Sequence, residues 1–264
     1  MPGVITVVTP VHAPSIPYLS EAYESLRSQV LPGAWSWEWA VQLDGLHPAD
    51  VPKLDVLTTD PRVTVCTNRA GGPGVARTAT LARTSGALVR ALDADDRLLP
   101  GALKRDIETL CQDPSLGWVA SKALDLLPDG TMTEWEFEDP ADGRLPVGSV
   151  LAYWSSHGWL LPILPGTICI RRDLLLALGG WMALPTSEDT GMLMAANEIS
   201  DGYFITDPSL AYRQHNGQVT GRADHLDPVE MQARRSLVVE RAQVNRRLAA
   251  NPVTFQWWRP KQRL

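Results

Sequence analysis

The first 96 residues alternate between short apolar runs and segments with helical periodicity. Pro17–Gln29 and Gly74–Ser85 have the spacing of helices, and Ser15 is placed to cap the first. Strands that alternate with helices form βαβ units with a parallel sheet, which binds ligands at the carboxyl ends of its strands. The pattern therefore predicts an α/β fold with a site along that edge. The apolar runs, typical of buried strands, are Val4–Val8, Trp37–Leu43, Val63–Cys66 and Ala87–Leu92.

Acidic residues follow two of these predicted strands. Asp44 comes after the second strand, and Asp93, Asp95 and Asp96 crowd directly behind the fourth. Carboxylates this close repel one another, and without a compensating cation at least one would stay protonated. A divalent metal is the usual compensator, and both Mg²⁺ and Mn²⁺ prefer oxygen ligands. The cluster fits a metal site that holds a diphosphate, and it also fits a solvated acidic turn.

Beyond Pro100 the expected elements are more varied, with a hairpin turn at Asp129-Gly130 and a loop over Glu134–Val147. Together the elements predict one main domain over residues 1–227, with halves that divide near residue 100, and a basic helical extension over 228–264. The helices are expected at Gly101–Cys111, Arg172–Leu178, Glu188–Asn197 and Pro228–Ala250. The strands are expected at Trp118–Leu127, Thr167–Ile170, Tyr203–Ile205 and Leu210–Tyr212.

Composition excludes several classes of protein. The net charge of −6 argues against a general nucleic-acid binder. No apolar run reaches the roughly 18 residues that a membrane-spanning helix needs. Three widely spaced cysteines suggest reduced thiols, and the N-terminus enters an apolar run without a basic lead. We therefore expect no secretory signal, no transmembrane segment and a cytoplasmic location.

The charge is uneven along the chain. Residues 229–264 carry eight basic and two acidic side chains, and this tail includes Trp257 and Trp258. A basic segment with aromatic residues can dock on anionic lipid as a peripheral anchor. It can equally pair two copies of the chain as a homodimer or cover the chain's own site, and the sequence leaves these alternatives open.

Five segments, in order and at plausible spacing, resemble the family 2 glycosyltransferases. The resemblance covers Val4 to Thr220 and implies the GT-A fold, in which helices flank a Rossmann-like, mostly parallel sheet, here followed by a basic C-terminal helix and tail. It also implies an inverting enzyme with a nucleotide-sugar donor. The segments are Val7–Val11, Ser25–Gln29, Asn68–Arg77, the aspartate-any-aspartate motif in Leu92–Asp96, and Gly179–Trp181 followed by Ser187–Asp189.

The resemblance implies roles on the donor side. Thr9 and Pro10 should line the nucleoside pocket, mostly through backbone groups, and Asp44 should accept a hydrogen bond from the base, such as the N3–H of uracil. Asp93 should contact the ribose or belong to the metal site through a metal-bound water. Asp95 should ligate the Mg²⁺ or Mn²⁺ that bridges the two phosphates. Where the family often has two adjacent acids, this chain has Leu43-Asp44.

Four further residues have alternative roles on that side. Arg77 either positions the nucleotide or pairs with a carboxylate on the helix surface. Asp96 contacts the sugar, supports the metal site or caps the following helix. His215 is a candidate third metal ligand, or a surface or capping residue. Arg213 is a candidate contact to the diphosphate.

Asp189 is the candidate catalytic base, because inversion needs one carboxylate that removes the proton from the attacking acceptor. Without the resemblance, it would be interpreted as a first-turn carboxylate favoured by the helix dipole. Its neighbour Glu188 is expected to be structural or to contact the acceptor.

The acceptor side is less well specified. Aromatic faces suit stacking on sugars or planar rings, and core packing explains the same residues. Gly166 could open the acceptor pocket because it lacks a side chain. The ring-bearing candidates in the segment that faces the acceptor in the family are Trp154, His157, Trp159 and Trp181.

Two other functions remain as alternatives. A nucleotidyltransferase of similar fold would need a glycine-rich loop after the first strand, whereas Pro10–Ser15 contains no glycine. A non-catalytic sugar- or nucleotide-binding module would have no need of Asp93, Asp95 and Asp189. The expected partners are a nucleotide-sugar donor and a small-molecule or glycan acceptor.

Overall fold

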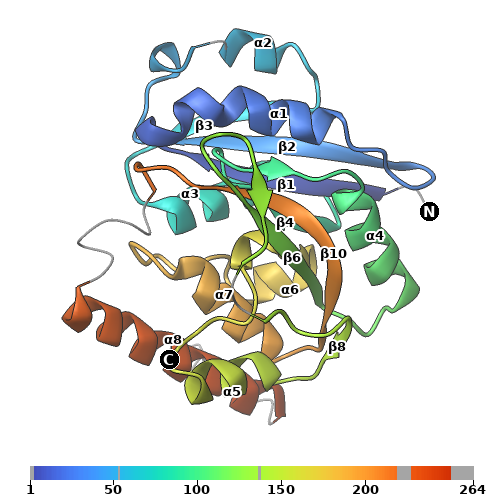
Figure 1. Cartoon of the computed structure of the whole chain (residues 1–264), viewed down its shortest axis with the longest axis vertical. Helices are drawn as coiled ribbons and strands as arrows, with labels where there is room; N and C mark the ends of the chain where they lie inside the picture. The colour runs from blue at the N-terminus through green and yellow to red at the C-terminus, as the bar shows by residue number, and fades with distance from the viewer. Residues whose placement is uncertain (1–2, 53, 136–137, 219–226, 251–264) are drawn as a thin grey trace, which may run out of the picture.

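The computed structural model describes residues 3–52, 54–135, 138–218 and 227–250. Within them, one curled sheet runs through the molecule with helices on both faces (Figure 1). Its strands are β1 (Gly3–Val11), β2 (Trp35–Asp44), β3 (Val63–Asn68), β4 (Leu88–Ala91), β5 (Arg97–Leu98), β6 (Trp118–Leu126), β7 (Met132–Thr133), β8 (Gly143–Leu145), β9 (Cys169–Arg171) and β10 (Gly202–Arg213).

The strand order is β3-β2-β1-β4-β9-β6-β10-β5, with β7 beside β6 and β8 beside β10. Strands β3, β2, β1 and β4 are parallel, and β6 is parallel to β10. Between these two sets, β9 pairs antiparallel with both β4 and β6. The prediction of a mostly parallel sheet flanked by helices is confirmed, whereas the antiparallel insertion of β9 was not predicted.

Helices cover the two faces of the sheet in separate groups. Side chains of α1, α2 and α4 join one apolar cluster with β1 and β2, and those of α5, α6, α7 and α8 join a second cluster on the other face. The α-helices are α1 (Leu19–Arg27), α2 (Leu54–Thr58), α3 (Pro73–Thr80), α4 (Ala102–Gln112), α5 (Ser149–Ser156), α6 (Arg172–Ala177), α7 (Glu188–Asn197) and α8 (Pro228–Ala250). The 3-10 helices are η1 (Ala13–Tyr18), η2 (Pro48–Asp50), η3 (Leu81–Arg83) and η4 (Pro165–Thr167).

Hydrophobic spacing explains how these helices pack. In α4, the buried apolar residues Leu103, Ile107 and Leu110 recur every three or four positions, which places them on one face. In contrast, α7 is buried along nearly its whole length. It lies between the sheet and α8, and α8 contributes Val238 and Ala242 to the same core (Figure 1). The first turn of α7 is therefore held in place from both sides.

Several predicted boundaries differ from the structure. The two predicted strands at 203–205 and 210–212 are one strand, β10, whose pairing register shifts between Ile205 and Leu210. Pro208 lies in that irregular stretch and masked the continuity of the strand. The predicted helix at 17–29 begins as η1, and Ser15 bonds the backbone of His12 rather than capping α1. The predicted loop at 134–147 includes the short strand β8.

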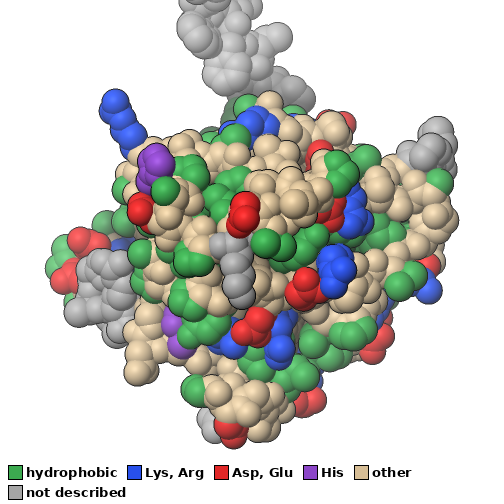
Figure 2. Space-filling view, turned by 90° about the horizontal axis from the view of Figure 1, so that it is seen from above, with side chains coloured by type: hydrophobic (Ala, Val, Ile, Leu, Met, Phe, Trp, Pro, Cys, Tyr) green, Lys and Arg blue, Asp and Glu red, His purple; other side chains and the backbone are tan. Residues whose placement is uncertain are grey.

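The sequence also made predictions about surface charge, membrane-spanning helices and a basic C-terminal helix. On the face seen from above, acidic and basic side chains are interspersed (Figure 2), whereas nucleic-acid binding calls for a continuous basic surface. Among the described residues, no helix is both long and apolar enough to cross a membrane. The predicted basic helix is present as α8, and the tail over 251–264 lies outside the described residues.

Candidate functional site

The predicted acidic residues meet at one edge of the sheet. Because β1, β2 and β4 are parallel, their carboxyl ends lie side by side, with Leu43 paired to Val11 and Ala91 paired to Val8. Asp44 is the last residue of β2, and the Asp93–Asp96 turn follows β4. The strand β10 runs the same way as β6 and delivers Arg213 and the residues after it to this rim. Carboxylates and basic groups from distant segments therefore face one another.

The carboxylate of Asp44 organises the loop at the end of β3. Its Oδ1 accepts hydrogen bonds from Asn68 Nδ2 at 2.6 Å and from the Gly71 N–H at 2.8 Å. Its Oδ2 accepts one from the Gly72 N–H at 2.9 Å. A carboxylate has about four acceptor positions, so the described residues occupy three and leave one on Oδ2. A single N–H donor from a base can still bind there, and base recognition by Asp44 stays a prediction.

Arg77 links the donor-side carboxylates to α7. Its guanidinium donates from Nη2 to Asp93 Oδ1 at 2.5 Å and from Nη1 to Glu188 Oε1 at 2.6 Å. The side chain is only 4 % exposed, and the surrounding carboxylates raise its pKa despite burial. Arg77 is therefore a buried cation between two carboxylates. Of its two predicted roles, carboxylate pairing is confirmed, although in the interior and not on the helix surface.

Two backbone features allow this close approach of α3 and α7. A Cβ at Gly74 would overlap the carbonyl oxygen of Met182 and lie 2.8 Å from Glu188 Cγ, so only glycine fits there. Ser187, the residue before α7, has a φ of 66°, which is uncommon for a residue other than glycine. Such conformations cost of order 1–3 kcal/mol and persist where the surroundings fix them. The entry into α7 is thus tightly determined.

The two acids that begin α7 differ in environment. Glu188 is 4 % exposed, and burial together with the neighbouring Asp189 charge raises its pKa to about 7. Asp189 is half-buried, and its Oδ1 accepts the Thr190 N–H at 2.6 Å. Burial also raises the pKa of Asp189, and Arg77 partly offsets that rise. Asp189 Oδ2 has no hydrogen-bond partner among the described residues, and a carboxylate with a raised pKa suits proton abstraction.

His215 holds Asp95 at the donor rim. The ring Nε2 lies 2.9 Å from Asp95 Oδ2, and Nδ1 accepts the Gly217 N–H at 3.1 Å. Because Nδ1 faces a donor, Nε2 carries the proton of the neutral ring and donates it to Asp95. In this arrangement His215 orients Asp95. Its predicted role as a metal ligand stays a prediction.

Arg213 also holds the Asp93–Asp96 turn in place. Its Nε donates to the Asp95 carbonyl oxygen at 2.7 Å, and its backbone N–H donates to Asp96 Oδ1 at 2.9 Å. The guanidinium also bonds Glu21 at 2.6 Å and lies 4.4 Å from the Tyr18 ring centroid. Arg213 is therefore engaged in holding the acidic turn, and its predicted contact with a diphosphate is not tested.

Several donor-side predictions need correction. Asp96 is 2 % exposed, and burial raises its pKa, so it supports the turn from within and does not reach a sugar. It also does not cap α4, whose N-cap is Gly101. Thr9 is completely buried, and its hydroxyl accepts a hydrogen bond from Trp39 Nε1 at 2.8 Å. Pro10 is buried as well, and the predicted contacts of these two residues with a nucleoside, mostly through backbone groups, stay a prediction.

The acceptor predictions have mixed outcomes. Trp154 and Trp181 are buried in the second apolar cluster, so core packing, and not acceptor stacking, explains both. Glu188 is paired with Arg77 in the protein interior and does not face an acceptor. Trp159 is half-buried with its ring edge against Trp154. His157 is exposed and stacked on Tyr153. A Cβ at Gly166 would make an ordinary contact with Leu210, so a side chain would fit there, and the predicted role of Gly166 in opening a pocket stays a prediction.

The donor set fits a hard cation only in part. Among the described residues, no group of three His, Cys, Asp or Glu side chains could hold a metal ion. Asp93 Oδ2 and Asp95 Oδ1 nevertheless have no hydrogen-bond partner within that part of the chain. Mg²⁺ is commonly bound through one or two carboxylates together with substrate phosphates. Two free carboxylate oxygens on one turn meet that requirement.

Sequence reasoning gave no role to three residues of this site. Asn68 lay inside a recognised segment, yet its contact with Asp44 depends on the pairing of β2 with β3. Tyr18 and Glu21 contact Arg213 although Glu21 lies 192 positions before it in the chain, and no local pattern marks them. Only the folded sheet brings these groups together.

A mostly parallel sheet with polar groups at the carboxyl ends of its strands is typical of α/β proteins that bind a ligand at that edge. The sequence matches the family described as "Glycosyl transferase family 2" over residues 6–173, which is more than half of the chain. The chain belongs to this family. The matched segment ends before α7, so it does not include Asp189, and the role of Asp189 as the catalytic base stays a prediction.

Relatives and solved structures agree with this assignment. The chain is 28 % identical over 201 residues to the succinoglycan biosynthesis protein ExoO of Rhizobium meliloti (strain 1021), covering 71 % of this chain and 56 % of ExoO. It therefore spans about half the length of that curated relative. The structure of S. aureus TarS 1–349 aligns with a TM-score of 0.69 at 16 % identity, over 96 % of this chain and 75 % of that chain.

The complex of TarS 1–349 with UDP aligns with a TM-score of 0.66 at 18 % identity, over 90 % of this chain and 64 % of that chain. At these identities the likeness shows the fold, which is GT-A. The predicted fold class and family are therefore confirmed.

Proposed function

We propose that this chain transfers a sugar from a nucleotide diphosphate sugar, with UDP-sugars preferred, to a small-molecule or glycan acceptor. Membership of glycosyl transferase family 2 supports glycosyl transfer. TarS, which has the same fold, has been solved with UDP and with UDP-GlcNAc, and this supports a UDP-sugar donor here. The free acceptor position on Asp44 Oδ2 suits the N3–H of uracil.

The observation that carries the proposal is the bridge made by Arg77. It brings Asp93, at the donor rim, and Glu188, next to Asp189, onto one guanidinium. A transferase needs its diphosphate site and its base on opposite sides of one anomeric carbon, and therefore close together. Solvated acidic turns would not require a buried cation between them. This favours a catalytic site over a binding module.

The residues suggest a single displacement. Asp189 takes the proton from the acceptor hydroxyl or amine while that atom attacks the anomeric carbon. The bond between the anomeric carbon and the diphosphate oxygen breaks, and its electron pair leaves with the diphosphate. An α-linked donor then gives a β-linked product, which is inversion.

The proposed reaction uses Mg²⁺ or Mn²⁺, which the free oxygens of Asp93 and Asp95 would bind. When bound, such an ion supplies charge neutralisation for the leaving diphosphate. His215 and Arg213 keep Asp95 in position for that role.

The test is to incubate the chain with UDP-glucose, UDP-galactose and UDP-GlcNAc, an acceptor panel and Mn²⁺, and to measure released UDP and inorganic pyrophosphate. Acceptor-dependent release of UDP is expected. In a parallel incubation with UTP and glucose 1-phosphate, release of pyrophosphate would instead indicate a nucleotidyltransferase. UDP binding without any release would indicate a binding module.

A further inference from the structure

A cavity lies beside α5, outside the carboxylate rim. It has two adjoining lobes that share Glu138, Asp139, Tyr153, Pro162 and Ile163 in their walls. The larger lobe encloses about 230 Å³. The sequence predictions for the acceptor did not include any of these five residues.

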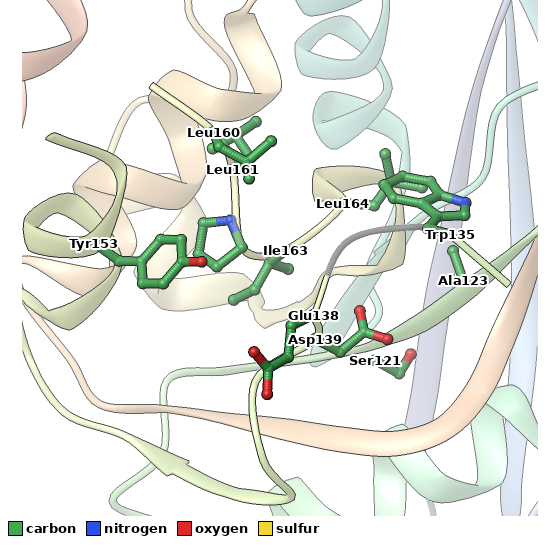
Figure 3. A pocket seen from close by; sticks show the side chains of 11 residues that line it. Ser121, Ala123, Trp135, Glu138, Asp139, Tyr153, Leu160, Leu161, Ile163 and Leu164 are labelled. Atoms are coloured by element: carbon green, nitrogen blue, oxygen red, sulfur yellow. The ribbon is translucent and has the colours of Figure 1, made fainter. Parts of the chain in front are cut away.

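The walls of the cavity are chemically two-sided. Figure 3 shows Leu160 and Leu161 on one side, the carboxylates of Glu138 and Asp139 on the opposite side, and Ile163 between them. The ring of Tyr153 closes a third side and is itself stacked on His157, with ring centroids 3.9 Å apart. A ligand in this space would contact apolar groups on one flank and negative charge on the other.

The charge of the cavity is negative. Among the described lining residues there is no Lys, Arg or His. Asp139 is paired with Lys122, which lies outside the lining, at 3.6 Å between Oδ2 and Nζ. Glu138 forms no ion pair within the described part of the chain and is exposed at the cavity wall. Charge complementarity therefore favours a cationic group and disfavours a phosphate or carboxylate.

The cavity also adjoins the donor rim. Trp135, on its wall, packs its ring edge against Tyr212, with centroids 6.0 Å apart. Tyr212 directly precedes Arg213, which bonds Asp95 and Asp96. Leu164, another wall residue, leads into η4, which packs against α7, the helix that carries Asp189.

We propose that this cavity binds the acceptor, and that the acceptor is an amphipathic molecule with an apolar group and a protonated amine. The inference rests on the proposed function, because it assigns the second substrate of that reaction. The apolar group lies against Leu160 and Ile163, and the amine lies against Glu138. A hydroxyl or second amine of the same molecule then presents itself toward the rim.

The test uses three probes with the same apolar part, titrated into the full chain by calorimetry near pH 7.5. The probes are 4-phenylbutylamine, 4-phenylbutanol and 4-phenylbutyrate. We expect the amine to bind at least tenfold more tightly than the carboxylate, with the alcohol between them. Glu138→Gln should reduce amine affinity to that of the alcohol, and Leu160→Arg should abolish amine binding. Glu240→Gln, at an exposed acid on α8, is the matched control and should change nothing.

A thermal shift with UDP and Mn²⁺ accompanies each titration and separates the two proposals. Equal affinity for amine and carboxylate, or no effect of Glu138→Gln, would overturn the acceptor assignment. If no probe binds while UDP still stabilises the chain, the cavity assignment is wrong and the proposed function stands. If the amine binds and UDP does not, the proposed function fails, and so does the assignment of the ligand as an acceptor.

Discussion

Arg77 on α3 and Glu188 at the start of α7 are 111 positions apart in the chain and are joined by a buried ion pair of 2.6 Å. The same guanidinium also bonds Asp93 at 2.5 Å. One cation therefore connects the acidic turn after β4 with the helix that carries Asp189. The two halves of the candidate site are fixed relative to each other through this residue.

Replacing Arg77 should be strongly destabilising. Arg77→Met leaves Glu188 buried without its cation, and breaking one side of a buried ion pair costs about 3–5 kcal/mol. Urea unfolding at pH 7 measures the loss. Arg27→Met is the matched control, because Arg27 and Glu24 also lie 2.6 Å apart but are 57 % exposed. That change should have little effect on stability, because exposed ion pairs contribute little. Similar losses in the two variants would contradict the role given to Arg77.

Glu188 should make stability depend on pH. Burial raises its pKa from the ordinary 4.5 to about 7, so the folded state binds a proton that the unfolded state has released. Stability contributed by the protonated group is complete below about pH 4.5 and is lost as the pH rises through about 7. The unfolding free energy of the wild type should therefore fall over this range relative to Glu188→Gln. Urea titrations at several pH values check this, and parallel profiles would refute it.

Asp189→Asn should separate catalysis from donor binding. The amide preserves shape but cannot take a proton, and general-base catalysis contributes typically 10²–10⁴-fold. Transfer should fall by orders of magnitude while UDP affinity is kept. Steady-state UDP release and calorimetry with UDP measure the two properties. Asp173→Asn, at an exposed acid on α6, is the control. Wild-type turnover in Asp189→Asn would remove Asp189 as the base.

The effect of Mn²⁺ on nucleotide binding should depend strongly on Asp95 and more weakly on His215. Asp95→Ala removes a proposed ligand and should abolish the effect of Mn²⁺ on nucleotide binding. His215→Ala removes a residue that orients that ligand at 2.9 Å, and such changes typically cost 10–100-fold in metal affinity. Titration of Mn²⁺ in the presence of UDP gives both affinities. A complete loss in His215→Ala would instead make His215 a ligand.

The strand ends of the first half were predictable from local pattern. The apolar runs before Asp44 and Asp93 indicate where β2 and β4 end. The parallel pairing of both strands with β1 then places these ends at the same edge of the sheet. The role of Arg77 was not predictable in full, because its partners Asp93 and Glu188 come from different segments. The antiparallel β9 carries no signal that distinguishes it from a parallel strand.

The aromatic residues show a second limit of sequence reasoning. Trp154 and Trp181 fit both an acceptor surface and a core, and only their 5 % and 4 % exposure decides for the core. The cavity beside α5 could not be foreseen, because its walls come from α5, from the segment after β7 and from residues 160–164, which meet only in the fold.

Nucleotide binding tests the central claim most directly, in a thermal-shift panel of UDP, GDP, dTDP, CDP and ADP, each with and without Mn²⁺. A ligand at about 100 times its Kd adds roughly 2.7 kcal/mol to stability, enough to raise Tm by a few degrees. We expect UDP to raise Tm, and to do so only with Mn²⁺. No shift with any nucleotide, with or without the metal, would contradict a working diphosphate site at Asp93 and Asp95.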